Sequence, residues 1–310
     1  MSLRLGTVPA VVVSSAAAAR DVLRTHDADC CSRPDTPGPR RLSYEHNDVA
    51  FSPYSERWRE RRRLMVAEFL SKRRIQDTWY AREAEVEKLI SRLASAGGGN
   101  EPVVLEEHVF AYMDGIVGTV AFGNIFGNGK DRRVNGRAGP EPTPSQEGAR
   151  RGQGHRRMVV KETLRLHPAL PLLVPRETLR DTKVAGYDVP ARTRVLVNAW
   201  AIGRDPTTWE NPEEFDPGRF QGEEGEEVGF SRARFEFLPF GAGRRMCPGI
   251  DMGVATTEFT LASLLYCFDW ELPEGMGCED VCMEEAGGLT VHKKTPLLLV
   301  PTRYKWQRQR

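Results

Sequence analysis

The chain of 310 residues contains no run of about 18 apolar residues, so no segment of it is predicted to span a membrane as a helix. It has only six cysteines, and two of them, Cys30 and Cys31, are adjacent and poorly placed to bridge. This excludes a disulfide-dense secreted domain and predicts reduced thiols on the cytosolic side. A formal net charge of +1 gives no general attraction to nucleic acid. The length suffices for one large domain or two small ones.

The N-terminal segment admits two interpretations. Residues 5–19 are apolar and small behind a basic residue, which is typical of a signal-peptide core. A glycine and a proline interrupt this stretch, however, and Ser14 or Ser15 can cap a following helix. We therefore favour a pair of strands over 3–13 and a helix over 16–25. A secreted interaction protein is an alternative that rests on this segment alone.

Apolar residues recur at helical spacing in several stretches. The predicted helices cover residues 57–69, 72–94, 105–122, 158–167 and a segment beginning at Ile250. Alternation around Gly186 and Tyr187 predicts a hairpin over 183–198. Residues 288–291 and 296–300 suggest a final pair of strands. The pattern predicts a mainly α protein with a small β domain, of the α+β class.

The composition changes abruptly between residues 128 and 157. This stretch is rich in glycine, arginine, proline and glutamate and has almost no apolar residue to bury, which is typical of a disordered linker. We therefore divide the chain into an N-terminal part, a linker, a C-terminal part and a basic tail. Their bounds are 1–127, 128–157, 158–304 and 305–310.

A glycine-rich stretch over residues 237–249 presents a cysteine just before a predicted helix. Its glycines and proline allow tight turns and positive φ. The helix dipole, together with Arg244 and Arg245, would lower the pKa of the Cys247 thiol and favour the thiolate. A thiolate on a loop of small residues can approach a flat metallocofactor, and haem iron fits best. An ordinary buried cysteine beside an arginine-rich loop is the alternative.

Five positions of this stretch fit the pattern F-x-x-G-x-R-x-C-x-G. They are Phe240, Gly243, Arg245, Cys247 and Gly249. The pattern is the haem-binding motif of the cytochrome P450 superfamily, which the chain resembles, and residues 268–273 look most like the plant A-type microsomal group. The resemblance implies a cytochrome P450-like fold and haem b as the cofactor. It also implies that Cys247 is the axial ligand of the iron and that the other four positions contact the cofactor.

Two further segments resemble family segments that hold the haem propionates. Trp58 and Arg62 lie four residues apart on one face of a basic helix, so an indole N–H and a guanidinium can converge on one anion. The resemblance assigns this pair to one propionate, and Arg176, which ends an apolar segment, to the other. Without the resemblance, a solvated basic face and a surface arginine after an edge strand would explain these residues. The outward arginines around Trp58 could also meet an acidic redox partner.

Glu162 and Arg165 lie three residues apart in the predicted helix over 158–167. The E-x-x-R spacing occurs elsewhere in the chain, so the pair gains meaning only from its setting, KETLRLHP, which is similar to the K-helix of the family. The resemblance adds Arg219, from the downstream segment over 209–220, as a third partner. It implies a buried charged triad whose role is structural and not catalytic.

The oxygen-activating pair of the family has no counterpart. The motif A/G-G-x-D/E-T is absent, and residues 115–119, GIVGT, lack an acid before the threonine. We therefore assign no catalytic residue. The chain resembles a family member that lacks its membrane anchor and its central helices, including the distal helix.

The family inserts one oxygen atom from O2 into an organic substrate, with electrons from an NADPH-dependent flavoprotein reductase, at the cytosolic face of the endoplasmic reticulum. The resemblance thus implies a haem-dependent monooxygenase of specialised metabolism that acts on a small hydrophobic substrate. We expect a monomer without a nucleic-acid partner, and, without an anchor, a cytosolic or peripheral location. The alternative is a truncated, inactive fragment that at most binds haem, because an open haem face cannot exclude water.

Overall fold

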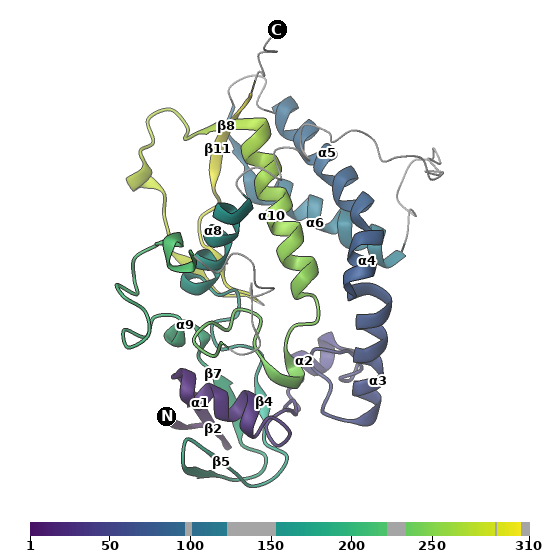
Figure 1. Cartoon of the computed structure of the whole chain (residues 1–310), viewed down its shortest axis with the longest axis vertical. Coiled ribbons are helices and arrows are strands. Elements are labelled where there is room, and N and C mark those ends of the chain that lie inside the picture. Colours follow the sequence, from purple (N-terminus) through teal and green to yellow (C-terminus); the bar gives the residue numbers. More distant parts are fainter. Residues whose placement is uncertain (97–100, 123–152, 222–233, 289, 305–310) are drawn as a thin grey trace. The chain divides into compact units, whose positions relative to one another are not determined.

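The computed structural model describes residues 1–96, 101–122, 153–221, 234–288 and 290–304 (Figure 1). The predicted tail over 305–310 and the predicted linker up to residue 152 lie outside the described residues. The chain divides into two units, each described by itself below. The first comprises Met1–Glu68, Met158–Ile250 and Gly287–Val291, and the second comprises Phe69–Arg157, Asp251–Ala286 and His292–Arg310.

The first unit is built on a four-stranded sheet with the strand order β1-β2-β7-β4. Its strands are β1 (Ser2–Leu5), β2 (Val8–Val13), β7 (Arg194–Val197) and β4 (Arg176–Glu177). β1 and β2 form an antiparallel hairpin that turns at Gly6, which has φ +65°, whereas β2 and β7 run parallel. Ser15 then caps α1 (Ala16–Arg20), which continues into the π-helical turn η1 (Asp21–Thr25). The predicted strand pair and helix are confirmed.

Apolar residues from this sheet and from α1 and η1 form one core of the first unit. Buried members include Val13, Val22, Leu23, Val195 and Val197. The alternation of half-buried and buried residues in β7 follows from its strand geometry, which points successive side chains to opposite faces. The sheet and the helix therefore bury a shared apolar surface, and this fixes the start of the loop that follows η1.

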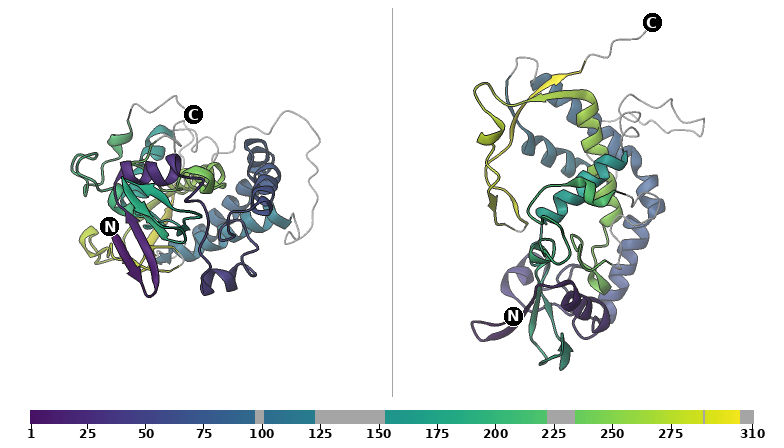
Figure 2. Two further views of the ribbon diagram at one scale, coloured as in Figure 1. Left: turned by 90° about the horizontal axis from the view of Figure 1, so that it is seen from below. Right: turned by 60° about the vertical axis from the view of Figure 1, so that its left-hand side comes forward.

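The remaining elements that lie in the first unit, in whole or in part, are a hairpin and several helices and helical turns. Their bounds are α2 (Pro37–Leu42), α3 (Glu56–Met65), η2 (Val66–Leu70), α8 (Gln153–Leu166), β5 (Thr182–Val184), β6 (Tyr187–Val189), α9 (Ala199–Ile202), η5 (Pro217–Phe220) and η6 (Gly243–Arg245). The β1–β2 and β5–β6 hairpins are visible as separate ribbons in Figure 2. Helix α8 begins five residues before the predicted start, so residues 153–157 are helical and not linker.

The second unit consists mainly of helices, and three of them share one core. Its helices are α4 (Lys72–Asp77), α5 (Trp79–Ala96), α6 (Leu105–Phe122) and α10 (Ile250–Cys267). Val86, Leu89 and Leu93 of α5 are spaced three and four residues apart and pack with Tyr112 of α6 and Phe259 of α10. The bounds predicted for α6 are confirmed without change. They were predictable because the apolar periodicity that indicates this helix lies within the helix itself.

The small strands of the second unit correct one prediction. β11 (Leu298–Arg303) pairs with β8 (Phe268–Glu271) and with β3 (Val103–Val104). The predicted final pair of 288–291 with 296–300 is therefore wrong. The short strands β9 (Glu285–Ala286) and β10 (His292–Lys293) pair with each other instead, and the 3₁₀ turn η7 (Cys278–Asp280) precedes them.

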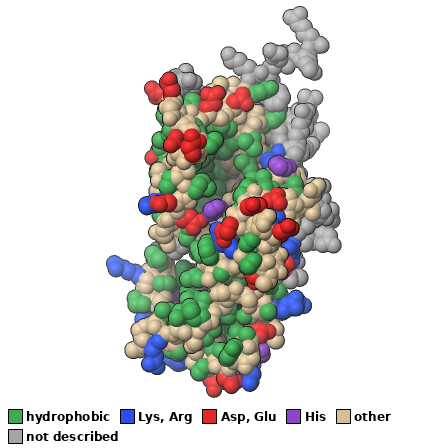
Figure 3. All heavy atoms as spheres, turned by 90° about the vertical axis from the view of Figure 1, so that its left-hand side faces the viewer, with side chains coloured by type: hydrophobic (Ala, Val, Ile, Leu, Met, Phe, Trp, Pro, Cys, Tyr) green, Lys and Arg blue, Asp and Glu red, His purple; other side chains and the backbone are tan. Residues whose placement is uncertain are grey.

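The predicted class, mainly α with small β-sheets, is confirmed. Within the described ranges, no helix has the length and apolar character needed to cross a bilayer. Both acidic and basic side chains are exposed on the face drawn in Figure 3, and neither sign covers it, in keeping with the small net charge.

Candidate functional site

The glycine-rich loop of the first unit presents Cys247 at the surface. Two of its glycines, Gly241 and Gly243, adopt φ of +65° and +70°, which are unfavourable for other residues. The amide of Cys247 donates a hydrogen bond to the carbonyl of Phe240 over 2.9 Å, which closes the loop. The Cys247 side chain is exposed, and α10 begins at Ile250, as predicted. The thiol thus lies on an irregular loop directly before a helix.

Gly243 is needed for space as well as for its backbone conformation. A Cβ atom there would overlap the carbonyl oxygen of Leu23 and lie 2.6 Å from Oδ1 of Asp27. Real Cβ atoms do not approach backbone oxygens so closely. The glycine of the motif therefore allows the cysteine loop to pack directly on the residues that end and follow η1.

Arg245 is buried beneath the loop, with 8% of its surface exposed. Its Nε donates to the carbonyl of Cys31 over 2.7 Å, and its Nη2 donates to the carbonyl of Ser52 over 2.8 Å. Its Nη1 is buried and makes no hydrogen bond to the described residues. Burial, reinforced by the nearby Arg176 and Arg62, lowers the pKa of Arg245 to about 10. A guanidinium in this state would gain from an added anion.

Trp58 and Arg62 lie together, but the indole N–H is already used. It donates to the carbonyl of Val49 over 2.9 Å, and the guanidinium carbon of Arg245 lies over the indole ring, 3.9 Å from its centroid. Arg62 donates to the carbonyl of Met246, the residue before Cys247. Convergence of the indole N–H and the guanidinium on one anion therefore stays a prediction. The observed geometry gives Trp58 a stacking role beneath Arg245.

Arg176 is buried, with 4% of its surface exposed, so the alternative of a surface arginine after an edge strand is wrong. Its Nη1 contacts Oδ1 of Asp27 over 2.8 Å, and its Nη2 donates to the carbonyl of Ala242, in the cysteine loop, over 2.8 Å. Oδ2 of the same Asp27 accepts from the amide and the Nη1 of Arg244 over 2.9 and 3.0 Å. One buried carboxylate thus joins two arginines.

Sequence reasoning missed Asp27 and a further buried cation, Arg33. The Nε of Arg33 donates to the carbonyl of Ala50 over 2.9 Å, and its Nη1 donates to those of Val174 and Pro175 over 2.8 and 2.9 Å. Burial lowers the pKa of Arg33 well below its ordinary value, and the positive charges of Arg176 and Arg245 add to this. Neither residue carries a local signal, because every partner is distant in the sequence.

Five arginines therefore lie in the cysteine loop or in the segments around it. We call them the arginine cluster: Arg33, Arg62, Arg176, Arg244 and Arg245. Asp27 neutralises part of this charge. The orphaned Nη1 of Arg245 and the excess of guanidinium groups suit a cofactor that carries carboxylates. Together with the exposed thiol of Cys247 on a loop of small residues, they fit a haem with two propionates.

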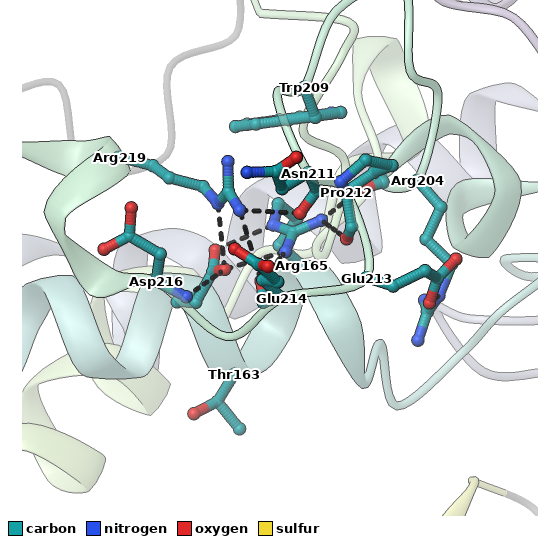
Figure 4. A network of polar contacts seen from close by, with 12 residues as sticks. Thr163, Arg165, Arg204, Trp209, Asn211, Pro212, Glu213, Glu214, Asp216 and Arg219 are labelled. Carbon is teal, nitrogen blue, oxygen red and sulfur yellow. Dashed lines mark hydrogen bonds and ion pairs between the residues drawn. The ribbon is translucent and has the colours of Figure 1, made fainter.

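The structure brings Glu162, Arg165 and Arg219 together in one network, of which Figure 4 labels Arg165 and Arg219. Glu162 and Arg165 are fully buried and paired at 2.7 Å through both carboxylate oxygens, and the Nε of Arg219 lies 3.2 Å from Oε1 of Glu162. Burial raises the pKa of Glu162, but the hydrogen bonds from Arg165, the amide of Asp216 and Arg219 outweigh it. The pKa of this carboxyl therefore lies below its ordinary value.

The same network holds a long loop in place. Arg165 donates to three backbone carbonyls, those of Gly203, Pro212 and Glu214, over 2.6–3.0 Å. Arg219 donates to the carbonyls of Glu210, Asn211 and Glu214. Most of these carbonyls belong to one irregular segment, so the network supplies hydrogen bonds that regular structure would otherwise provide.

An open cavity of about 510 Å³ lies along the basic face of α3. Its lining residues are Tyr54, Trp58, Arg59, Arg62, Arg63, Val66, Ala67 and Arg244. Four of these eight side chains are cationic, and the other four are aromatic or aliphatic. The predicted basic surface around Trp58 is thus a cavity lined by arginines.

The comparisons with known proteins agree with this fold. Residues 1–136 and 156–300 match the sequence family described as cytochrome P450. A solved zebrafish cytochrome P450 bound to abiraterone is similar in fold, with a TM-score of 0.74 and 21% identity over 98% of this chain and 96% of that chain. These findings define a cytochrome P450 fold. The chain belongs to the cytochrome P450 family.

The chain is also similar to curated plant proteins that are named as monooxygenases or as cytochromes P450, as the resemblance to the plant group predicted. The chain is 41% identical to a 4-hydroxyphenylacetaldehyde oxime monooxygenase of Sorghum bicolor, with 99% of this chain and 83% of the relative covered. It is 34% identical to a 2-methylbutanal oxime monooxygenase of Manihot esculenta, with 99% and 85% covered. The first alignment spans 443 positions, more than the 310 residues of this chain. The relative therefore contains internal segments without a counterpart here.

Proposed function

We propose that the first unit binds haem b with Cys247 as the axial thiolate ligand. The observation that carries this proposal is the buried, orphaned Nη1 of Arg245 inside the arginine cluster, next to a loop whose thiol is exposed. Arg245, Arg176 and Arg62 would neutralise the propionates. The positive φ of Gly241 and Gly243 would shape the loop that presents the thiol to the cofactor. When bound, haem supplies an iron whose reaction with O2 is promoted by electron density from the thiolate.

We further propose that the chain performs the reaction of its family on a small hydrophobic substrate, with electrons from an NADPH-dependent flavoprotein reductase at the cytosolic face of the endoplasmic reticulum. The arginine-lined cavity on α3 is the surface to which an acidic face of the reductase would bind. Three of the similar proteins are named as oxime monooxygenases, so aldoximes are the first substrate class to test.

A second candidate is a haem-binding chain without turnover. The sequence lacks the acid–threonine pair with which the family manages protons, and the relatives contain internal segments that this chain does not have. In this candidate the residues around Cys247 still hold the cofactor, but water is not excluded from the reacting face. Haem binding and substrate oxidation are thus separable properties of this chain.

Isotope labelling distinguishes the two candidates. The haem-loaded chain, a plant NADPH-dependent reductase and a panel of aldoximes are incubated under ¹⁸O2, and the products are analysed by mass spectrometry. Monooxygenation predicts incorporation of one ¹⁸O atom that requires NADPH and is lost in Cys247→Ser. Consumption of NADPH with release of hydrogen peroxide and no labelled product would contradict turnover and favour the second candidate.

A further inference from the structure

Asp27 joins three segments that are far apart in the sequence. It follows η1, and its side chain is 5% exposed. It contacts Arg176, which lies 149 residues later, and Arg244, which lies 217 residues later. The amide of Arg244 is among its donors, so Asp27 holds the backbone of the cysteine loop as well as a side chain.

The loop is held from two sides. Asp27 accepts from the amide of Arg244, while Arg176 donates to the carbonyl of Ala242 two residues earlier. Gly243, between them, lacks the Cβ that would lie 2.6 Å from Oδ1 of Asp27. The carboxylate, its arginine partner and the glycine therefore fix the turn that precedes Cys247 by only a few residues.

The negative charge of Asp27 also offsets part of the positive charge of the arginine cluster. Asp27 is a buried anion in contact with two members of the arginine cluster, and the orphaned Nη1 of Arg245 is another donor of the same cluster. Loss of the Asp27 charge would leave Arg176 buried without its carboxylate. Any charged group bound near Cys247 would then experience one more uncompensated positive charge.

We infer that Asp27 is a positioning residue of the haem site, which anchors the cysteine loop and lowers the reduction potential of the iron through its buried negative charge. This inference rests on the proposed function. A buried anion stabilises ferric haem relative to ferrous haem, because the ferric form carries one more positive charge. Residues that orient the ligands of a metal without touching it are typically worth 10- to 100-fold in affinity.

The test compares Asp27→Asn with Asp29→Asn in the haem-loaded chain. Asp29 lies in the same loop, and Asp29→Asn removes the same negative charge, but the ion-pair partner of Asp29 is the exposed Arg180. For Asp27→Asn we expect haem transfer to apomyoglobin that is about 10- to 100-fold faster and a more positive reduction potential. Asp29→Asn should match the unsubstituted chain in both. Equal transfer rates and equal potentials for the two variants would overturn the inference.

A second variant covers the case in which Asp27→Asn does not fold. Arg244→Gln removes the partly exposed partner of Asp27 and leaves the buried Arg176 pair intact. It should loosen the haem and shift the potential in the opposite direction, to a more negative value, because a positive charge is lost. An unchanged potential and transfer rate in this variant would equally overturn the inference.

Hydrogen exchange separates this inference from the proposed function. If the unsubstituted chain binds no haem through Cys247, the proposed function fails, but the anchoring by Asp27 can still be measured in the haem-free chain. Amides of residues 242–247 should exchange faster in Asp27→Asn than in Asp29→Asn. Equal exchange would show that Asp27 does not position the loop.

Discussion

Glu162→Gln is expected to lower the free energy of unfolding by about 3–5 kcal/mol. The substitution removes the charge that Arg165 and Arg219 share, in a place where Glu162 and Arg165 are fully buried. The glutamine would turn an amide N–H₂ toward a guanidinium and leave the buried cation without a counterion. Urea denaturation of the haem-free variant and the unsubstituted chain measures the difference.

The effect should depend on pH with a defined sign. The pKa of Glu162 lies below its ordinary value in the folded chain, so its ionised form stabilises the fold above the ordinary carboxyl range. This stabilisation is lost as the pH falls through the folded-state pKa. The difference between Glu162→Gln and the unsubstituted chain should therefore be largest near neutral pH and shrink in acid.

Glu213→Gln is the matched control for this prediction. Its ion pair with Arg204, at 3.1 Å, lies beside the same network in Figure 4, but the Glu213 side chain is 70% exposed. An exposed pair contributes about 1 kcal/mol or less. Equal small losses in the two variants would refute the idea that the Glu162 network holds the loop in place.

The second large effect is expected for Gly243→Ala. The alanine must adopt a φ near +70°, and its Cβ would overlap the carbonyl oxygen of Leu23 and crowd Asp27. Backbone strain and overpacking together should cost about 2–6 kcal/mol and displace the cysteine loop. Thermal unfolding and the amount of haem retained after gel filtration measure both consequences.

Gly253→Ala is the matched control in the same chain, and the opposite outcome is expected for it. Gly253 lies within α10, and a Cβ there meets no other atom within 4 Å. Alanine favours helix over glycine by about 1 kcal/mol, so this variant should be slightly more stable and should keep its haem. If Gly243→Ala were as stable as Gly253→Ala and retained as much haem, this would contradict the close packing of the cysteine loop on η1.

Local signals explain what the sequence could predict. The β1–β2 hairpin, α6 and the start of α10 follow from turn residues and apolar periodicity within each segment. The start of α8 was missed because its first turn has the same basic, glycine-containing composition as the preceding segment. The partner of β11 was also missed, because strand pairing between distant segments leaves no trace in either one.

The residues of the candidate site likewise divide into those that a local sequence pattern reveals and those that it does not. The motif residues around Cys247 are recognisable because their spacing is fixed within ten residues. Asp27 and Arg33 are not, because each has partners more than 100 residues away in the chain. The hydrogen bond from Trp58 to Val49 could not be foreseen either, since helical spacing places the indole on a face but does not determine its partner.

The most direct test of the haem-thiolate proposal is the carbon monoxide difference spectrum of the reduced, haem-loaded chain beside Cys247→Ser. We expect a red-shifted Soret band of the thiolate type in the unsubstituted chain, and its loss in the variant, because serine does not supply a thiolate. A failure to take up haem, or a Soret band that Cys247→Ser leaves unchanged, would contradict the assignment of Cys247 as the axial ligand.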